Sequence, residues 1–112
     1  MNILFLCTSN LNRSRTAEDY FRSVDNKHTY QSASLSEKYC NHYNTRLCSI
    51  ELLEWADKIF VMEPMHVGRI TKHAGVRYLA KIEMLNIDDF YRYIQTELID
   101  QLKLSNPLQF IE

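Results

Sequence analysis

The sequence predicts an α/β fold, a three-layer α/β/α arrangement in which helices cover both faces of a four-stranded parallel sheet. One observation is the first segment, residues 2–6, a nearly continuous apolar run typical of a strand buried on both faces. A second is that short apolar segments alternate with amphipathic ones along the chain, a pattern that favours parallel strands joined by crossover helices. In such folds ligands bind beyond the carboxyl ends of the strands.

The expected elements follow this alternation. We expect strands at residues 2–6, 28–33, 58–62 and 81–85, and helices at residues 14–23, 50–56, 64–74 and 96–104. Ser49 is placed to cap the second helix, and we expect Ile50, Leu53 and Trp55 of that helix to pack inward. Pro64 suits the first position of the third helix and Gly75 its end. The polar segments 34–45 and 86–95 are expected to be loops, with one helical turn as an alternative in the first.

Length and composition limit what the chain can be. At 112 residues, with 46% hydrophobic and 24% charged residues, residues 1–112 are expected to form one soluble globular domain. The net charge of −1 gives no reason to expect nucleic acid or a membrane as a partner. No apolar run resembles a signal peptide or a membrane span, and the three cysteines lack the paired spacing of a disulfide framework. A reducing, cytoplasmic location is expected.

The chemistry is expected in the segment from Cys7 to Ser14, between the first strand and the first helix. Its backbone amides can form a concave anion site, and the helix that follows directs its positive end to the same place, which also stabilises the Cys7 thiolate. Arg13 can bind two oxygens of an oxyanion such as phosphate, sulfate or vanadate, whereas Ser14 is placed to hydrogen-bond the thiolate. The predicted phosphate-binding residues are Thr8, Ser9, Asn10, Leu11, Asn12 and Arg13.

This segment resembles the low-molecular-weight protein tyrosine phosphatases, whose signature is Cys-x5-Arg-Ser followed by Ala-Glu. The matching residues are Cys7, Asn10, Arg13, Ser14, Ala17 and Glu18. A weaker match continues through residues 52–62 and 85–98. The resemblance implies a four-stranded parallel sheet and hydrolysis of a phosphate monoester through a phosphocysteine, without metal or other cofactor. The substrate would be a phosphorylated protein or a small phosphate monoester.

The chain departs from the family pattern at several positions. Ser9 stands where glycine is usual, Asn12 replaces the second cysteine of the loop, and Arg15 replaces a proline. The chain is also short and lacks much of the segment that walls the pocket in longer members. These differences leave the expected reaction unchanged, but they mean that the resemblance alone does not identify the substrate.

The resemblance also implies an acid near the C-terminus, where the family has an Asp-Pro-Tyr-like loop. Aligning residues 87–91 with that loop makes Asp89 the general acid and Tyr91 an aromatic edge of the pocket, with Phe90 in place of proline. Asp88 is the alternative acid. A reaction through a phosphocysteine needs such a group to protonate the leaving oxygen and later to activate water.

Three other functions stay open. An arsenate reductase of the same fold would need two further cysteines, and Cys40 and Cys48 are available. A phosphocarrier would keep a stable phosphocysteine, although Arg13 favours turnover. A non-hydrolytic anion-binding module would result if both aspartates pointed away from Cys7.

Overall fold

In the computed structural model, which describes residues 1–110, four parallel strands form one sheet in the order β2-β1-β3-β4. The strands are β1 (Asn2–Cys7), β2 (Thr29–Ser34), β3 (Lys58–Val61) and β4 (Ile82–Met84). Because β1 and β3 are central, the loops that follow them meet at the middle of one sheet edge. The predicted α/β/α class is confirmed.

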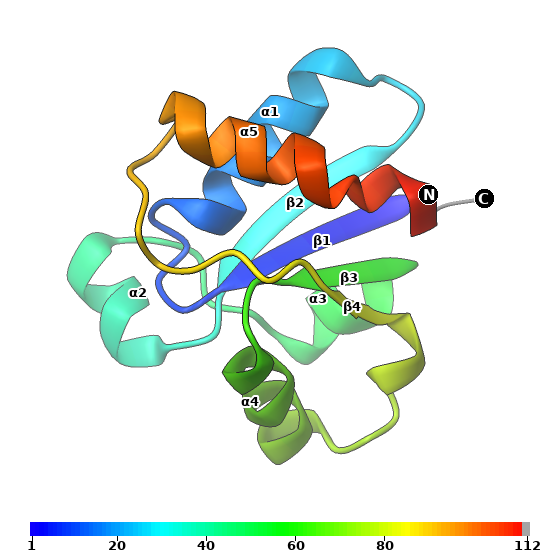
Figure 1. The fold of residues 1–112 in the computed structure, drawn as a ribbon. Helices are drawn as coiled ribbons and strands as arrows, with labels where there is room; N and C mark the ends of the chain where they lie inside the picture. Colours follow the sequence, from blue (N-terminus) through cyan, green and yellow to red (C-terminus); the bar gives the residue numbers. More distant parts are fainter. Residues whose placement is uncertain (111–112) are drawn as a thin grey trace.

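Helices cover both faces of the sheet (Figure 1). The helices are α1 (Arg13–Val24), α2 (Glu37–Tyr43), α3 (Ile50–Trp55), α4 (Pro64–Ala74) and α5 (Thr96–Ser105), with short 3₁₀ turns at Leu79–Lys81 and Pro107–Phe110. Helices α1 and α5 lie on one face, α3 and α4 on the other, and α2 lies near the end of β1 where the chain enters α1. Within residues 1–110, every helix is too short or too polar to span a membrane.

The alternation of side chains along β1 divides the core in two. Ile3, Phe5 and Cys7 belong to the cluster under α1 and α5, whereas Leu4 and Leu6 belong to the cluster under α3 and α4. This is the period of two expected of a strand. It directs the Cys7 side chain to the face that carries α1.

The helix ends follow the predicted signals. The Ser49 side chain accepts a hydrogen bond from the Leu52 amide at 3.2 Å, so it caps α3. Pro64 is the first residue of α4, and Gly75 follows its last residue with φ of 76°, a left-handed value that favours glycine.

Two local expectations were wrong. Residues 34–45 contain more than a loop with one helical turn, because the seven residues Glu37–Tyr43 form α2. This helix begins after a Ser36 cap and ends at Asn44 in the left-handed conformation. In α3, Ile50 is exposed, and Leu52 is buried beside Leu53 instead. The reason is that the helix has only six residues, so few of its positions face the sheet.

The ring of Phe5 belongs to the core cluster under α1 and α5, which we call the α1-side core. It is fully buried and packs on Phe60 and Phe21, with ring centroids 5.5 and 5.7 Å away. Phe5→Ala should lower the free energy of unfolding by about 3–5 kcal/mol, because it removes the ring and leaves a cavity. Urea denaturation measures this. Val24→Ala is the control, since Val24 is 59% exposed and its loss should change stability by less than about 0.5 kcal/mol; equal effects of the two changes would contradict the assignment of the core.

Candidate active site

Cys7 is the last residue of β1, and its thiol faces the start of α1. The Sγ atom lies 3.0 Å from Ser14 Oγ, and the Ser14 amide donates to the same sulfur at 3.5 Å. Cys7 and Ser14 are both buried. The structure therefore brings together the thiol and the hydroxyl that the sequence predicted to act on it.

The amino end of α1 is placed to stabilise negative charge at this sulfur. The helix begins at Arg13, its N-cap Asn12 makes no side-chain capping hydrogen bond, and its first turn contains no acidic residue. The positive end of the helix dipole is thus not offset by a carboxylate of its own first turn. An anion in the loop between Cys7 and Ser14 would experience that field.

Asn10 braces this loop from within. It is 3% exposed, has a left-handed φ of 58°, and its side-chain amide donates to Ser14 Oγ at 2.7 Å and to Ser32 Oγ at 2.9 Å. Ser32 in turn donates to Glu18 Oε1 at 2.5 Å. Because Asn10 occupies an acceptor site of the Ser14 oxygen, the Ser14 O–H remains available to donate to Cys7.

The backbone of the loop explains why it can have Ser9 at a position where the family has glycine. Among residues 1–110, Asn10 is the member of this loop with positive φ, and Ser9 is not. Serine is therefore accommodated at position 9 without left-handed strain. The Ser9 carbonyl also accepts a hydrogen bond from Thr45 Oγ1 at 2.5 Å, which ties the outer part of the loop to the chain after α2.

Arg13 is the most buried charge of the site, with a side chain 2% exposed. Its Nη1 donates to Glu63 Oε1 at 2.9 Å and to the Ile87 carbonyl at 2.7 Å. Glu63 follows β3 and Ile87 follows β4, so the guanidinium joins the loops of three strands. Nη1 has two hydrogens and both are used, so the donors without a hydrogen bond to these two partners are on the Nε and Nη2 edge.

Asp89 lies at this remaining edge of Arg13. Its Oδ1 is 3.7 Å from Arg13 Nε, and its side chain is 65% exposed. Asp88 is also exposed, and its carbonyl accepts from the Phe90 amide at 2.9 Å in a tight turn. The geometry thus brings Asp89 to the arginine, whereas its role as the acid stays a prediction.

The aromatic residues after Asp89 differ in exposure. Phe90 is 83% exposed, whereas Tyr91 is half-buried and packs against the α1-side core. The two rings meet edge to face with centroids 5.6 Å apart. A pocket-edge role for Tyr91 stays a prediction.

His66 is a site residue whose contact with the loop the sequence did not reveal. It caps α4 and is fully buried. Its Nδ1 accepts from the amides of Met62 and Glu63 at 3.2 and 3.0 Å, so Nε2 carries the proton and donates to Thr8 Oγ1 at 3.1 Å. Burial, and secondarily the charges of Arg13 and Arg69, lower the pKa of His66 to about 4. The ring is therefore neutral at physiological pH.

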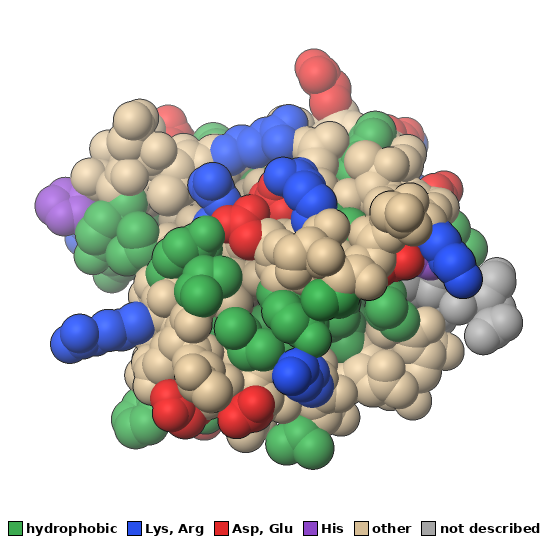
Figure 2. Space-filling view, turned by 90° about the horizontal axis from the view of Figure 1, so that it is seen from above, with side chains coloured by type: hydrophobic (Ala, Val, Ile, Leu, Met, Phe, Trp, Pro, Cys, Tyr) green, Lys and Arg blue, Asp and Glu red, His purple; other side chains and the backbone are tan. Residues whose placement is uncertain are grey.

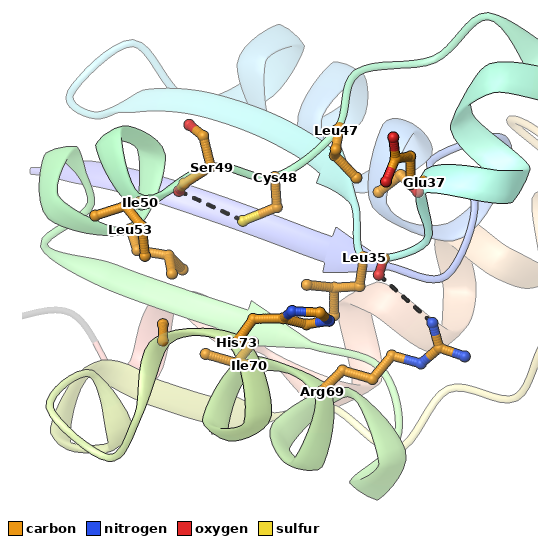
Figure 3. Close-up of a pocket in the computed structure, with 12 residues that line it drawn as sticks. Leu35, Glu37, Leu47, Cys48, Ser49, Ile50, Leu53, Arg69, Ile70 and His73 are labelled. Atoms are coloured by element: carbon orange, nitrogen blue, oxygen red, sulfur yellow. Dashed lines mark hydrogen bonds between the residues drawn. The ribbon is translucent and has the colours of Figure 1, made fainter.

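The other two cysteines are engaged locally. Cys40 is buried in α2, and its thiol donates to the Glu37 carbonyl at 3.3 Å. Cys48 lines a pocket of about 350 Å³ between α3, α4 and the chain after β2 (Figure 3). Burial raises the pKa of the Cys48 thiol to about 11, which disfavours the thiolate that a redox relay would need.

The fold is that of the low-molecular-weight protein tyrosine phosphatases, as the resemblance implied. One solved structure that it matches is the phosphatase SP-PTP from Streptococcus pyogenes, at 15% identity and a TM-score of 0.74, covering 99% of this chain and 93% of that one. Another is Vibrio vulnificus Wzb in complex with benzylphosphonate, at 21% identity and a TM-score of 0.72, covering 93% and 90%.

A third matching structure is a YwlE arginine phosphatase mutant with a phosphorylated active-site serine. It is 23% identical, with a TM-score of 0.73, over 100% of this chain and 98% of that one. No protein-family model matches the sequence, and no curated protein does. At these identities the structural matches establish the fold.

The buried neutral His66 predicts a loss of stability in acid. Its pKa is about 4 in the folded protein and about 6.5 when unfolded, so below about pH 6.5 the unfolded chain binds more protons. Its contribution is complete above about pH 6.5 and is lost as the pH falls toward 4, to a total of about 3 kcal/mol. Denaturant unfolding should show about 2 kcal/mol of this loss between about pH 7.5 and about pH 5.

His66→Gln is the control for this pH dependence. The variant should be less stable at neutral pH but should lose about 2 kcal/mol less than the parent protein on acidification, because the other titrating groups are unchanged. Identical pH slopes for the two proteins would contradict a neutral buried His66.

Proposed function

We propose that this protein hydrolyses phosphate monoesters through a phosphocysteine intermediate on Cys7. One observation carries the proposal: the thiol, the buried Arg13 and the Asp89 carboxylate converge on one sheet edge, at the amino end of α1. The fold supports it, because its structural neighbours include protein phosphatases. Three free cysteines, none in a disulfide, suit a cytoplasmic enzyme.

Binding of the phosphoryl group is assigned to Arg13 and to the amides of the loop, Thr8 to Arg13. Because Glu63 and the Ile87 carbonyl occupy Nη1, the guanidinium presents its Nε and Nη2 hydrogens as a planar pair for two oxygens. Fixed donors of this kind stabilise charge that develops on the equatorial oxygens in the transition state.

In the first step the Cys7 thiolate attacks phosphorus in line. A sulfur–phosphorus bond forms while the phosphorus–oxygen bond to the leaving group breaks, and Asp89 gives its proton to the departing oxygen. Asp89 suits this role because its side chain is exposed to an incoming substrate and lies beside Arg13, the residue assigned to orient the phosphoryl group.

In the second step water hydrolyses the phosphocysteine. Asp89, now a carboxylate, accepts a proton from the water as its oxygen attacks phosphorus, and the sulfur leaves as a thiolate. The Ser14 hydroxyl, 3.0 Å from Sγ, donates a hydrogen bond that stabilises the leaving sulfur. The products are an alcohol and inorganic phosphate, and the enzyme returns to its starting protonation state.

Cys7→Ser tests the nucleophile. It should abolish hydrolysis of para-nitrophenyl phosphate, because a serine hydroxyl at this position is not ionised and has no general base within the described contacts of Cys7 Sγ and Ser14 Oγ. The protein should remain folded, which circular dichroism checks, and vanadate should inhibit the parent enzyme. Full activity of the Cys7→Ser protein would overturn the proposal.

Asp89→Asn and Asp88→Asn form a matched pair that identifies the acid. Asp89→Asn should lower kcat about 100-fold or more, because the amide can neither give nor take the proton. Asp88→Asn should change kcat less than about twofold, since Asp88 is an exposed turn residue whose carbonyl makes the contact to Phe90. Steady-state kinetics with para-nitrophenyl phosphate distinguish the two, and the reverse result would reassign the acid to Asp88.

A further inference from the structure

A groove lies directly beside the loop that joins β1 to α1. It has a volume of about 580 Å³ and is lined by residues 10–12 of that loop, by Arg15 of α1, by Thr45 and by Arg92 and Tyr93. We call it the outer groove. Since the loop contributes to both, any substrate group that extends from a phosphate bound at Cys7 toward Thr45 or Arg92 enters the outer groove.

The outer groove carries positive charge. Arg15 is half exposed and lies 3.3 Å from the Asp19 carboxylate through Nε, which leaves its terminal nitrogens free to bind another group. Arg92 is exposed, and its guanidinium forms no ion pair with any carboxylate among residues 1–110. The Asp89 carboxylate is next to the inner Arg13 rather than in the groove lining.

The wall that carries Arg92 is fixed to α1. The Tyr93 hydroxyl donates to the Asp19 carboxylate, and the Ile94 amide donates to the buried Thr16 Oγ1 at 2.9 Å. Ile94 has a φ of 58°, which is unfavourable for a β-branched residue and is maintained by these surrounding contacts. The Arg92 backbone is therefore held at a set position relative to Arg15.

This positive charge is local. On the face that carries α1 and α5, basic and acidic side chains lie next to one another (Figure 2). The pair Glu18–Arg22 on α1, 2.5 Å apart, is one instance. Opposite charges on this face therefore largely offset one another. In the outer groove, by contrast, two arginines are balanced by the single carboxylate of Asp19, which leaves an excess of positive charge.

We propose that the outer groove binds a carboxylate of the substrate, so that the preferred substrate is a peptide in which acidic residues flank the phosphorylated side chain. Arginine pairs well with carboxylates because its planar donors can bind both oxygens. The proposal rests on the proposed phosphatase activity and names the substrate class for it. Arg15, which stands where the family has proline, acquires a role as a specificity residue.

The test uses two phosphotyrosine peptides that differ only in having glutamate or glutamine at the positions on either side of the phosphotyrosine. The parent enzyme should show a kcat/KM about threefold to fivefold higher for the glutamate peptide, the range expected of one or two exposed ion pairs. Arg92→Gln should bring this ratio close to one. Arg15→Gln should do the same or invert it, because it leaves the Asp19 carboxylate without a cation to offset its charge.

Arg77→Gln is the matched control. Arg77 is an exposed arginine paired with Glu54 at 2.6 Å, and it lies in the chain between α4 and β4, which leads to the opposite end of the sheet. This variant should keep the ratio of the parent enzyme. A parent ratio near one at low ionic strength, or a ratio unchanged in both Arg92→Gln and Arg15→Gln, would overturn the proposal.

Two further measurements separate this proposal from the proposed function. Raising the ionic strength should reduce the ratio in the parent enzyme, because exposed charges are screened. Calorimetric binding of both peptides to the Cys7→Ser protein should give the same preference as a ratio of Kd values, without any turnover. If the parent enzyme hydrolyses para-nitrophenyl phosphate but the two Kd values are equal, the proposed role of the outer groove is wrong and the proposed phosphatase activity stands. If the acidic peptide binds tightly but the parent enzyme hydrolyses nothing, the proposed phosphatase activity is wrong and the carboxylate-binding role of the outer groove stands.

Discussion

The site depends on one buried charge, the guanidinium of Arg13. A guanidinium keeps its charge at any pH the protein meets, so burying it requires partners that arrive from elsewhere in the fold. Here they come from the ends of two other strands: Glu63 after β3 and the Ile87 carbonyl after β4. Because β1, β3 and β4 are adjacent and parallel, these groups reach the same edge as Cys7. The order of the strands therefore brings the partners of Arg13 to the edge of the sheet that carries Cys7.

A neutral hydrogen-bond network holds the loop around that charge. On one side Asn10 connects Ser14 to Ser32, and on the other His66 holds Thr8 from the start of α4. Each group in this network has its partner, which is the condition for a buried polar cluster to be stabilising. The low pKa of His66 matters here, because a second cation beside Arg13 would disturb the balance of charge in the loop.

Much of this could be predicted from the sequence, because the signals are local. The apolar run of β1, the proline and glycine that bound α4, and the spacing from Cys7 to Arg13 each depend on neighbouring residues. Glu63 and His66 could not be found in this way, because their partners lie 50 and 58 residues away in the chain. A signal was nevertheless present: Glu63 comes just after a buried strand, where a parallel sheet directs its ligands. Helix α2 was expected as a single turn at most, because its apolar spacing is weak and its caps are its main local signal.

The two carboxylates at Arg13 are not equivalent, and this difference orders the proposed reaction. Glu63 is fixed twice, since it binds the guanidinium and caps α4 by accepting from the His66 amide. Asp89 is exposed, belongs to a loop and lies 3.7 Å from Nε, beyond hydrogen-bond distance. An oxyanion that binds the Nε and Nη2 edge must displace Asp89 rather than Glu63. In the proposed reaction the displaced Asp89 carboxyl group stays next to the bound anion. Binding of the phosphoryl group at Arg13 would then also free Asp89 to protonate the leaving oxygen.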